Sequence, residues 1–341
     1  MLAVSLRDRM ASRSSRFVAD LSGATLTGVL DAYSAFVRKT HVNYTNSSVI
    51  NAIRRFEADC LDSPLLPIDV SDIFWTEFRE YLFTTPNYRG NTIKPSSFAT
   101  YRSMICAALA YGSKHGARID DTYRSCEIDN YKKTKIALST SQIAHIFYYD
   151  IDANKERIKH IADEMGVHRF SFASLKRVRD HFVFSCQIGQ RYSDSSAIAE
   201  DNLDASRTVL SVTQQKTGAK AVVNIPKYCI DKKIAYDILE RYHYTAPAIG
   251  MDINNYNKLL HVLVRSIGGE FDKVVSTTNK VNGALMREDM PMWRYISSHT
   301  ARRTLITHLL RRGVDLMHIQ RVSGHKELKH LQRYVILDDD E

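Results

Sequence analysis

A histidine and two arginines lie within about one turn of a predicted helix in the carboxyl-terminal part of the chain. The segment SSHTARRTLITHLL spans residues 297–310, and helical spacing puts His299, Arg302 and Arg303 on roughly one face. Guanidinium groups stay charged at any working pH and can donate paired hydrogen bonds to phosphate oxygens. The same layout is also typical of an ordinary amphipathic helix with solvated arginines. Taken alone, this segment favours the ordinary helix.

Three further segments carry residues that could act with this one. They are CQIGQRYSD with Arg191, TQQKTGAK with Lys216, and SGHKELKHLQRYV with His325 and Tyr334. Each is weak evidence alone, because an arginine after a glycine turn or a lysine beside a hairpin turn is a common surface feature. Their order and approximate spacing together are not common.

The composition limits the class of partner and the compartment. The 341 residues include 47 Lys and Arg against 38 Asp and Glu, so the formal net charge of +9 favours an anionic polymer as partner. Five cysteines are scattered singly, which is typical neither of a zinc site nor of a secreted disulfide scaffold, and predicts a reducing, cytosolic compartment. No apolar run approaches the ~20 residues of a membrane span, and we expect no membrane partner.

The four segments together resemble the tyrosine recombinase (phage integrase) family. Its catalytic domain is marked by an arginine after a glycine-containing turn, a lysine on a β-hairpin, an H-x-x-R motif, a G-H pair and a tyrosine shortly after that pair. This chain has Gly189-Gln190-Arg191, Lys216, His299-Thr300-Ala301-Arg302, Gly324-His325 and Tyr334. The resemblance implies a mainly α fold with a small β-hairpin, built as a helical core-binding domain and an α+β catalytic domain.

The resemblance also implies a role for each catalytic candidate. Tyr334 would attack the phosphorus and form a 3′-phosphotyrosyl bond. Lys216 would protonate the leaving 5′-oxygen, and His299 would act as general base toward Tyr334.

Four further residues would bind the phosphate or orient the groups that do. Arg191 and Arg302 would hold the non-bridging oxygens, and by analogy with oxyanion donors each could contribute about 3 to 4 kcal/mol in the transition state. His325 would donate to the scissile phosphate, and Asp194 would orient the basic groups. We expect no metal and no other cofactor, because the sequence shows no metal-ligand cluster.

The activity implied is site-specific recombination of DNA through a Holliday junction, for integration or excision of a mobile element or phage. The implied partners are duplex DNA with inverted-repeat core sites and a homotetramer formed on that DNA from monomers or dimers, with an accessory directionality factor as a further candidate. The resemblance therefore implies a cytoplasmic, nucleoid-associated protein.

Helical periodicity and turn signals predict the organisation of the chain. We expect a flexible arm at 1–24, a helical core-binding (SAM-like) domain at 25–116, a linker at 117–137 and the catalytic domain at 138–341. Within the last, VLSVTQQ, KTGAK and AVVNI predict a β-hairpin turning around Gly218, and helices resume at Lys227 and continue to the carboxyl end. Thr140 or Ser141 is the expected cap of the first catalytic-domain helix.

Two alternatives remain open. A type IB topoisomerase shares the catalytic residues but would relax supercoils as a monomer. A non-catalytic DNA-binding relative would occupy sites without cutting.

The chain also departs from the family where Ile188-Gly189 replaces the usual Thr-Gly, and where only seven residues, Val335 to Glu341, follow Tyr334. Whether cleavage occurs in cis or in trans therefore stays open.

Overall fold

The chain forms two compact units. The computed structural model describes residues 20–41, 44–88, 90–128, 136–281, 284–328 and 331. One unit comprises Met1–Lys132 with Asn279–Met286, and the other comprises Lys133–Thr278 with Arg287–Glu341. The expected arm at 1–24 lies almost wholly outside the described residues. Tyr334 also lies outside them.

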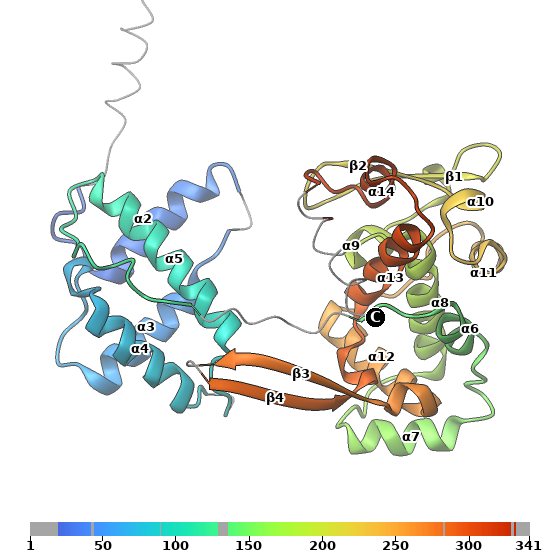
Figure 1. Ribbon diagram of the computed structural model, residues 1–341, viewed down its shortest axis with the longest axis horizontal. Coiled ribbons are helices and arrows are strands. Elements are labelled where there is room, and N and C mark those ends of the chain that lie inside the picture. The colour runs from blue at the N-terminus through green and yellow to red at the C-terminus, as the bar shows by residue number, and fades with distance from the viewer. Residues whose placement is uncertain are drawn as a thin grey trace, which may run out of the picture. The chain divides into compact units, whose positions relative to one another are not determined.

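The amino-terminal unit is a bundle of α-helices (Figure 1). Its elements are α2 (Leu26–Arg38), α3 (Ser47–Cys60), the 3₁₀ turn η1 (Pro67–Asp69), α4 (Asp72–Thr84) and α5 (Pro95–Ser113). The Thr25 side chain accepts a hydrogen bond from the amide of Gly28, and the Ser71 side chain accepts one from Phe74. These caps satisfy helix-end amides that would otherwise lack a partner, which fixes where α2 and α4 begin.

Part of the expected linker packs against this bundle. Tyr123 is buried, and its carbonyl accepts a hydrogen bond of 2.9 Å from Nε1 of the buried Trp75. An indole N–H inside an apolar core needs such a partner. Residues 117–128 therefore contribute to the bundle's core, while the domain boundaries themselves stay a prediction.

The carboxyl-terminal unit is built around α8. Its helices are α6 (Thr140–Tyr148), α7 (Lys155–Glu164), α8 (Phe172–Ile188), α9 (Tyr192–Ser195), α10 (Ile225–Tyr228), α11 (Lys232–Arg241), α12 (Ile253–Ile267), α13 (Ser298–Arg311) and α14 (Leu316–Ser323), with 3₁₀ turns η2 (Glu200–Asn202), η3 (Gly269–Asp272) and η4 (Met292–Tyr295). Helices α6, α11, α12 and α13 all contact α8 (Figure 1). From Phe182 to Ile188 every residue of α8 is buried, because neighbours cover it on all sides.

The expected hairpin around Gly218 is present. Strand β1 (Val209–Thr213) pairs antiparallel with β2 (Lys220–Asn224), with Val209 opposite Asn224 and Thr213 opposite Lys220. Gly218 has φ +65°, a left-handed conformation that glycine adopts without strain. Helix α14 contacts β2, which brings the carboxyl-terminal helices onto the hairpin (Figure 1).

The prediction of uninterrupted helix after Lys227 is wrong. A second antiparallel pair, β3 (Val274–Val281) and β4 (Ala284–Pro291), lies between α12 and α13. The β-branched run VVSTTNKV followed by Asn-Gly in the sequence is a strong hairpin signal that helical periodicity obscured. The cap of α6 also differs, since Ser139 rather than Thr140 or Ser141 accepts from the amide of Gln142.

Candidate active site

Arg191 is positioned by the end of α8. Gly189 caps this helix with φ +66°, and a Cβ there would lie 2.7 Å from Cδ2 of Leu305 on α13. Glycine is therefore needed both for its backbone conformation and for the close approach of α13. The chain turns at this glycine, and Arg191 follows as the N-cap residue of α9 with its side chain 25% exposed.

The turn that carries Arg191 is braced from inside by a buried histidine. The His181 ring on α8 hydrogen-bonds the Tyr256 hydroxyl through Nδ1 at 3.0 Å and the Ser195 hydroxyl through Nε2 at 3.1 Å. The amide of Ser195 in turn donates to the carbonyl of Arg191 at 2.7 Å. Burial lowers the pKa of His181 to about 3, because the charged imidazolium would lose its hydration. His181 is thus neutral at physiological pH.

Asp194 faces Arg191 from the same turn. Its Oδ1 accepts from the amide of Gln215 at 2.9 Å, and its Oδ2 lies 3.9 Å from Nη1 of Arg191. The carboxylate is 2% exposed, and Oδ2 is buried without a hydrogen bond among the described residues. A buried carboxylate oxygen at this distance attracts the guanidinium and restricts where it can lie.

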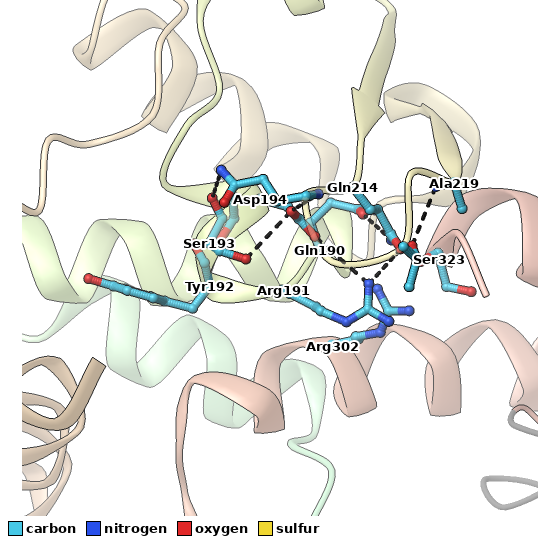
Figure 2. Close-up of polar contacts among 12 residues, drawn as sticks. Gln190, Arg191, Tyr192, Ser193, Asp194, Gln214, Ala219, Arg302 and Ser323 are labelled. Atoms are coloured by element: carbon cyan, nitrogen blue, oxygen red, sulfur yellow. Dashed lines mark hydrogen bonds and ion pairs between the residues drawn. The ribbon is translucent and has the colours of Figure 1, made fainter. Parts of the chain in front are cut away.

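Arg302 lies inside α13 with 1% of its surface exposed. Its Nη1 donates to the carbonyl of Gly189 at 3.2 Å, so Arg302 contacts the turn that carries Arg191 (Figure 2). Its Nη2 lies 3.2 Å from both ring nitrogens of His325. Arg302 therefore connects the turn after α8 with the residues that follow α14.

His325 is presented by the end of α14. Gly324 ends this helix in the left-handed conformation, with φ +67°, and the Ser323 hydroxyl lies 2.7 Å from Nδ1 of His325. The ring lines a surface cavity of about 450 Å³ that is also lined by Lys220 and Arg321. His325 is therefore accessible to a ligand on a basic part of the surface.

Lys216 and His299 are both exposed. Lys216 lies in the turn between β1 and β2, which is closed by the hydrogen bond from the amide of Gln214 to the carbonyl of Ala219 at 2.9 Å. His299 is in the first turn of α13, one turn before Arg302. An exposed lysine on a tight turn and an exposed histidine at a helix start can both reach a bound ligand.

The structure thus brings Arg191, Asp194, Arg302 and His325 together, with Lys216 on the adjoining loop. His299 shares the helix of Arg302, and Tyr334 lies outside the described residues. Sequence reasoning missed two buried glutamines, Gln190 and Gln214, although both stand inside the segments that carry Arg191 and Lys216. Neither residue type suggests catalysis, so only their hydrogen bonds reveal them (Figure 2).

Two features are absent from the described ranges. They contain no group of three or more His, Cys, Asp or Glu side chains that could hold a metal ion. They also contain no helix that is long and apolar enough to cross a membrane.

The model of the phage integrase family matches residues 156–341 of this chain. The chain belongs to this family. All of the candidate residues lie within the matched range, which covers more than half of the sequence.

A relative from Thermococcus kodakarensis supports the assignment. Tyrosine recombinase XerA is 30% identical over 146 residues, which are 43% of this chain and 46% of the relative. The match therefore spans less than half of that relative.

Solved structures share the fold along nearly the whole chain. A lambda integrase dimer bound to a COC′ core site is similar with a TM-score of 0.56 and 17% identity, over 93% of this chain and 97% of that one. The Tn1549 transposon integrase in complex with a circular intermediate DNA has a TM-score of 0.54 and 14% identity, over 91% and 94%. The fold, mainly α with small antiparallel sheets, is thus that of tyrosine recombinases.

Proposed function

We propose that this protein is a site-specific DNA recombinase that cleaves and rejoins duplex DNA through Tyr334. The observation that carries the proposal is the convergence of Arg191, Arg302 and His325 on the turn after α8, joined by the hydrogen bonds of Arg302 to Gly189 and His325. Two guanidiniums beside one imidazole form a cluster of donors suited to a single phosphate group. These three residues come from segments that lie far apart in the sequence.

The first chemical step forms one bond and breaks one. The phenol oxygen of Tyr334 attacks the phosphorus, its proton passes to His299, and the bond to the 5′-oxygen breaks as Lys216 protonates that oxygen. Arg191, Arg302 and His325 stabilise the charge that develops on the non-bridging oxygens. The bond energy is kept in the 3′-phosphotyrosine, so rejoining by a 5′-hydroxyl reverses the step without ATP. All the electrostatic stabilisation comes from side chains, so no metal is required.

Recombination needs two such sites together. We therefore include in the proposal a homotetramer assembled on duplex DNA with inverted-repeat core sites, passing through a Holliday junction. A lambda integrase tetramer bound to a Holliday junction, with a TM-score of 0.54 and 18% identity to this chain, supports an assembly of this kind. Movement of a genetic element within the nucleoid, aided by an accessory directionality factor, completes the proposal.

Covalent capture tests the proposal. The protein is incubated with a library of nicked duplexes in EDTA and without ATP, and the adducts are mapped by peptide sequencing and the trapped DNA by sequencing. We expect an adduct through Tyr334 on an enriched, partly palindromic site, abolished in Tyr334→Phe and retained in Tyr148→Phe, a tyrosine 65% exposed on α6.

The other outcomes would each overturn part of the proposal. An adduct through Tyr334 with little sequence preference would favour topoisomerase chemistry. Binding without any adduct would favour a non-catalytic DNA-binding protein. An adduct that forms only when divalent cations are restored would contradict the metal-independent mechanism.

A further inference from the structure

Gln214 occupies a buried position at the base of the loop that carries Lys216. It is the first residue after β1 and is 1% exposed. Its amide donates to the carbonyl of Ala219 at 2.9 Å, and its carbonyl accepts from the amide of Gly218 at 2.8 Å. These two bonds close the loop and fix the backbone of Gln214 independently of its side chain.

Four hydrogen bonds fix the side-chain amide of Gln214 (Figure 2). Nε2 donates to the carbonyl of Ser323 at 2.7 Å and to Oε1 of Gln190 at 3.2 Å. Oε1 accepts from Nη1 of Arg191 at 2.5 Å and from the hydroxyl of Thr217 at 3.0 Å. Both N–H groups and both lone pairs are used, and a flipped amide would set Nε2 against the Arg191 guanidinium. The orientation of the amide is therefore determined by its partners.

Gln190 supports the same arrangement from the other side. It is fully buried, and its Nε2 donates to the carbonyl of Ile188 at 3.0 Å and to that of Val322 at 2.9 Å. Its Oε1 is thereby left as the acceptor for Gln214. The two amides join the end of α8, the start of the Lys216 loop and the end of α14 in one hydrogen-bonded unit.

Gly324 shows how closely Gln214 is packed. A Cβ on Gly324 would lie 2.4 Å from Nε2 and 2.7 Å from Cδ of Gln214, which is closer than any side chain tolerates. The residue before His325 must therefore lack a side chain for Gln214 to reach the carbonyl of Ser323. The G-H pair and the buried amide are two parts of one arrangement.

We infer that Gln214 is a positioning residue that holds the Arg191 guanidinium in place for the scissile phosphate, and that it does so by fixing Nη1 through Oε1. The inference rests on the proposed function, which assigns Arg191 to phosphate binding. Gln214 does not touch substrate in this view, and it acts only through Arg191. A guanidinium on a 25% exposed side chain has many rotamers, so a buried acceptor that fixes one of them removes an ordering cost from the reaction.

A double-mutant cycle on cleavage tests this inference. Gln214→Met keeps the size of the side chain and removes its polar atoms. We expect single-turnover covalent capture to slow by about 100-fold, the scale of a misplaced reacting group, while DNA affinity changes less than about twofold. In an Arg191→Ala background the same substitution should have no further effect, because the group that it positions is gone. Gln142→Met, the same change on α6, removes a side-chain bond to the amide of Ser139 and none to the Arg191 turn, so it is the matched control and should cleave as the wild type does.

A second variant keeps the test independent of packing losses. Gln214→Glu retains the shape, and only its protonated form offers one acceptor to Arg191 and one donor to the carbonyl of Ser323. Its cleavage rate relative to wild type at the same pH should therefore rise as the pH falls. A purely structural role for Gln214 predicts multiplicative defects with Arg191→Ala and no recovery at low pH, and either result would overturn the inference.

Side-chain NMR separates this inference from the proposed function. In protein carrying ¹⁵N-arginine, the Arg191 Nη signals are assigned by their loss in Arg191→Lys. Slow solvent exchange that becomes fast in Gln214→Met supports the contact even if the wild type forms no adduct. Unchanged exchange refutes it even if Tyr334 cleaves DNA.

Discussion

In the amino-terminal unit the buried interior is aromatic and aliphatic. Phe78 packs edge-on to Phe56 and stacked on Phe74, with ring centroids 5.3 and 5.1 Å apart. Among the buried polar side chains of the described residues, Ser34 and Asn46 lie in this unit and all others in the carboxyl-terminal unit. The carboxyl-terminal interior has a large apolar core of its own, and it adds a polar part that extends from His181 through Gln190 and Gln214 to Arg302.

This difference follows from what each interior must fix. Apolar contacts are non-directional, so the bundle needs only shape and volume to be stable. Hydrogen bonds are directional, and each partner of Gln214 constrains an orientation as well as a distance. A site that must hold two guanidiniums and an imidazole around one group gains from such constraints, at the cost of burying polar atoms that all need partners.

The largest expected loss of stability comes from a substitution in the apolar interior of the amino-terminal unit. Phe78→Ala should lower the free energy of unfolding of the amino-terminal unit by about 3 to 5 kcal/mol, because it removes a fully buried ring and leaves a cavity. Trp75 lies in this unit and the chain's other tryptophan, Trp293, in the other, so urea unfolding in a Trp293→Phe background is followed through Trp75 alone. Ile73→Ala, on the same helix and 69% exposed, should cost less than about 0.5 kcal/mol. Equal losses in the two variants would contradict the packing described.

A smaller effect is expected where the polar interior meets a glycine. Gly324 and Gly313 both have φ +67°, but a Cβ on Gly313 would meet nothing within 4 Å. Alanine at either position should lower the free energy of unfolding by about 1 to 2 kcal/mol, because the left-handed conformation is strained for a residue with a Cβ. Gly324→Ala should cost about 1 to 3 kcal/mol more, because Gln214 must move.

Urea unfolding and covalent capture measure the two parts of this prediction. We expect Gly324→Ala to lose cleavage with Gln214 displaced, whereas Gly313→Ala keeps it. An equal loss of stability in the two alanine variants would contradict the close approach of Gln214 to Gly324.

What the sequence predicts well is whatever depends on local spacing. The hairpin at Gly218 is confirmed, and it depends on residues within a few positions of one another, as do the motifs that name Arg191, Arg302 and His325 as candidates. The hydrogen-bond partner of a buried amide does not depend on local spacing. Gln214 bonds the carbonyl of Ser323, which lies 109 residues away in the sequence. Nothing in the spacing of TQQKTGAK distinguishes Gln214, buried with four partners, from its exposed neighbour Gln215.

The missed β3–β4 hairpin has a different cause. Its signal is local, since a run rich in β-branched residues at 274–281 precedes an Asn-Gly pair at 282–283. Helix α12, which precedes the hairpin, is strongly amphipathic, and the prediction extended helix from this part of the chain to the carboxyl end. The family resemblance supplied the order of the catalytic candidates, but not the hydrogen bonds that hold them.

The effect most specific to the polar interior, and the smallest over any single pH unit, is a dependence of stability on pH. Burial holds the pKa of His181 at about 3, whereas an unfolded chain gives it about 6.5. Between those values the unfolded state binds one more proton than the folded state, so stability is fully present above about pH 6.5 and falls as the pH drops towards 3. The slope from this group is at most about 1.4 kcal/mol per pH unit.

His181→Gln should remove this contribution, because a glutamine can still bond the Tyr256 and Ser195 hydroxyls but does not titrate. Carboxylates titrate alike in both proteins, so the difference between their unfolding profiles from pH 7 to pH 4 isolates His181. The amino-terminal unit, followed through Trp75, serves as an internal reference and should show no difference between the two proteins. A wild-type slope equal to that of His181→Gln would mean that His181 is hydrated or charged in the folded protein, and the turn carrying Arg191 would then lack its buried brace.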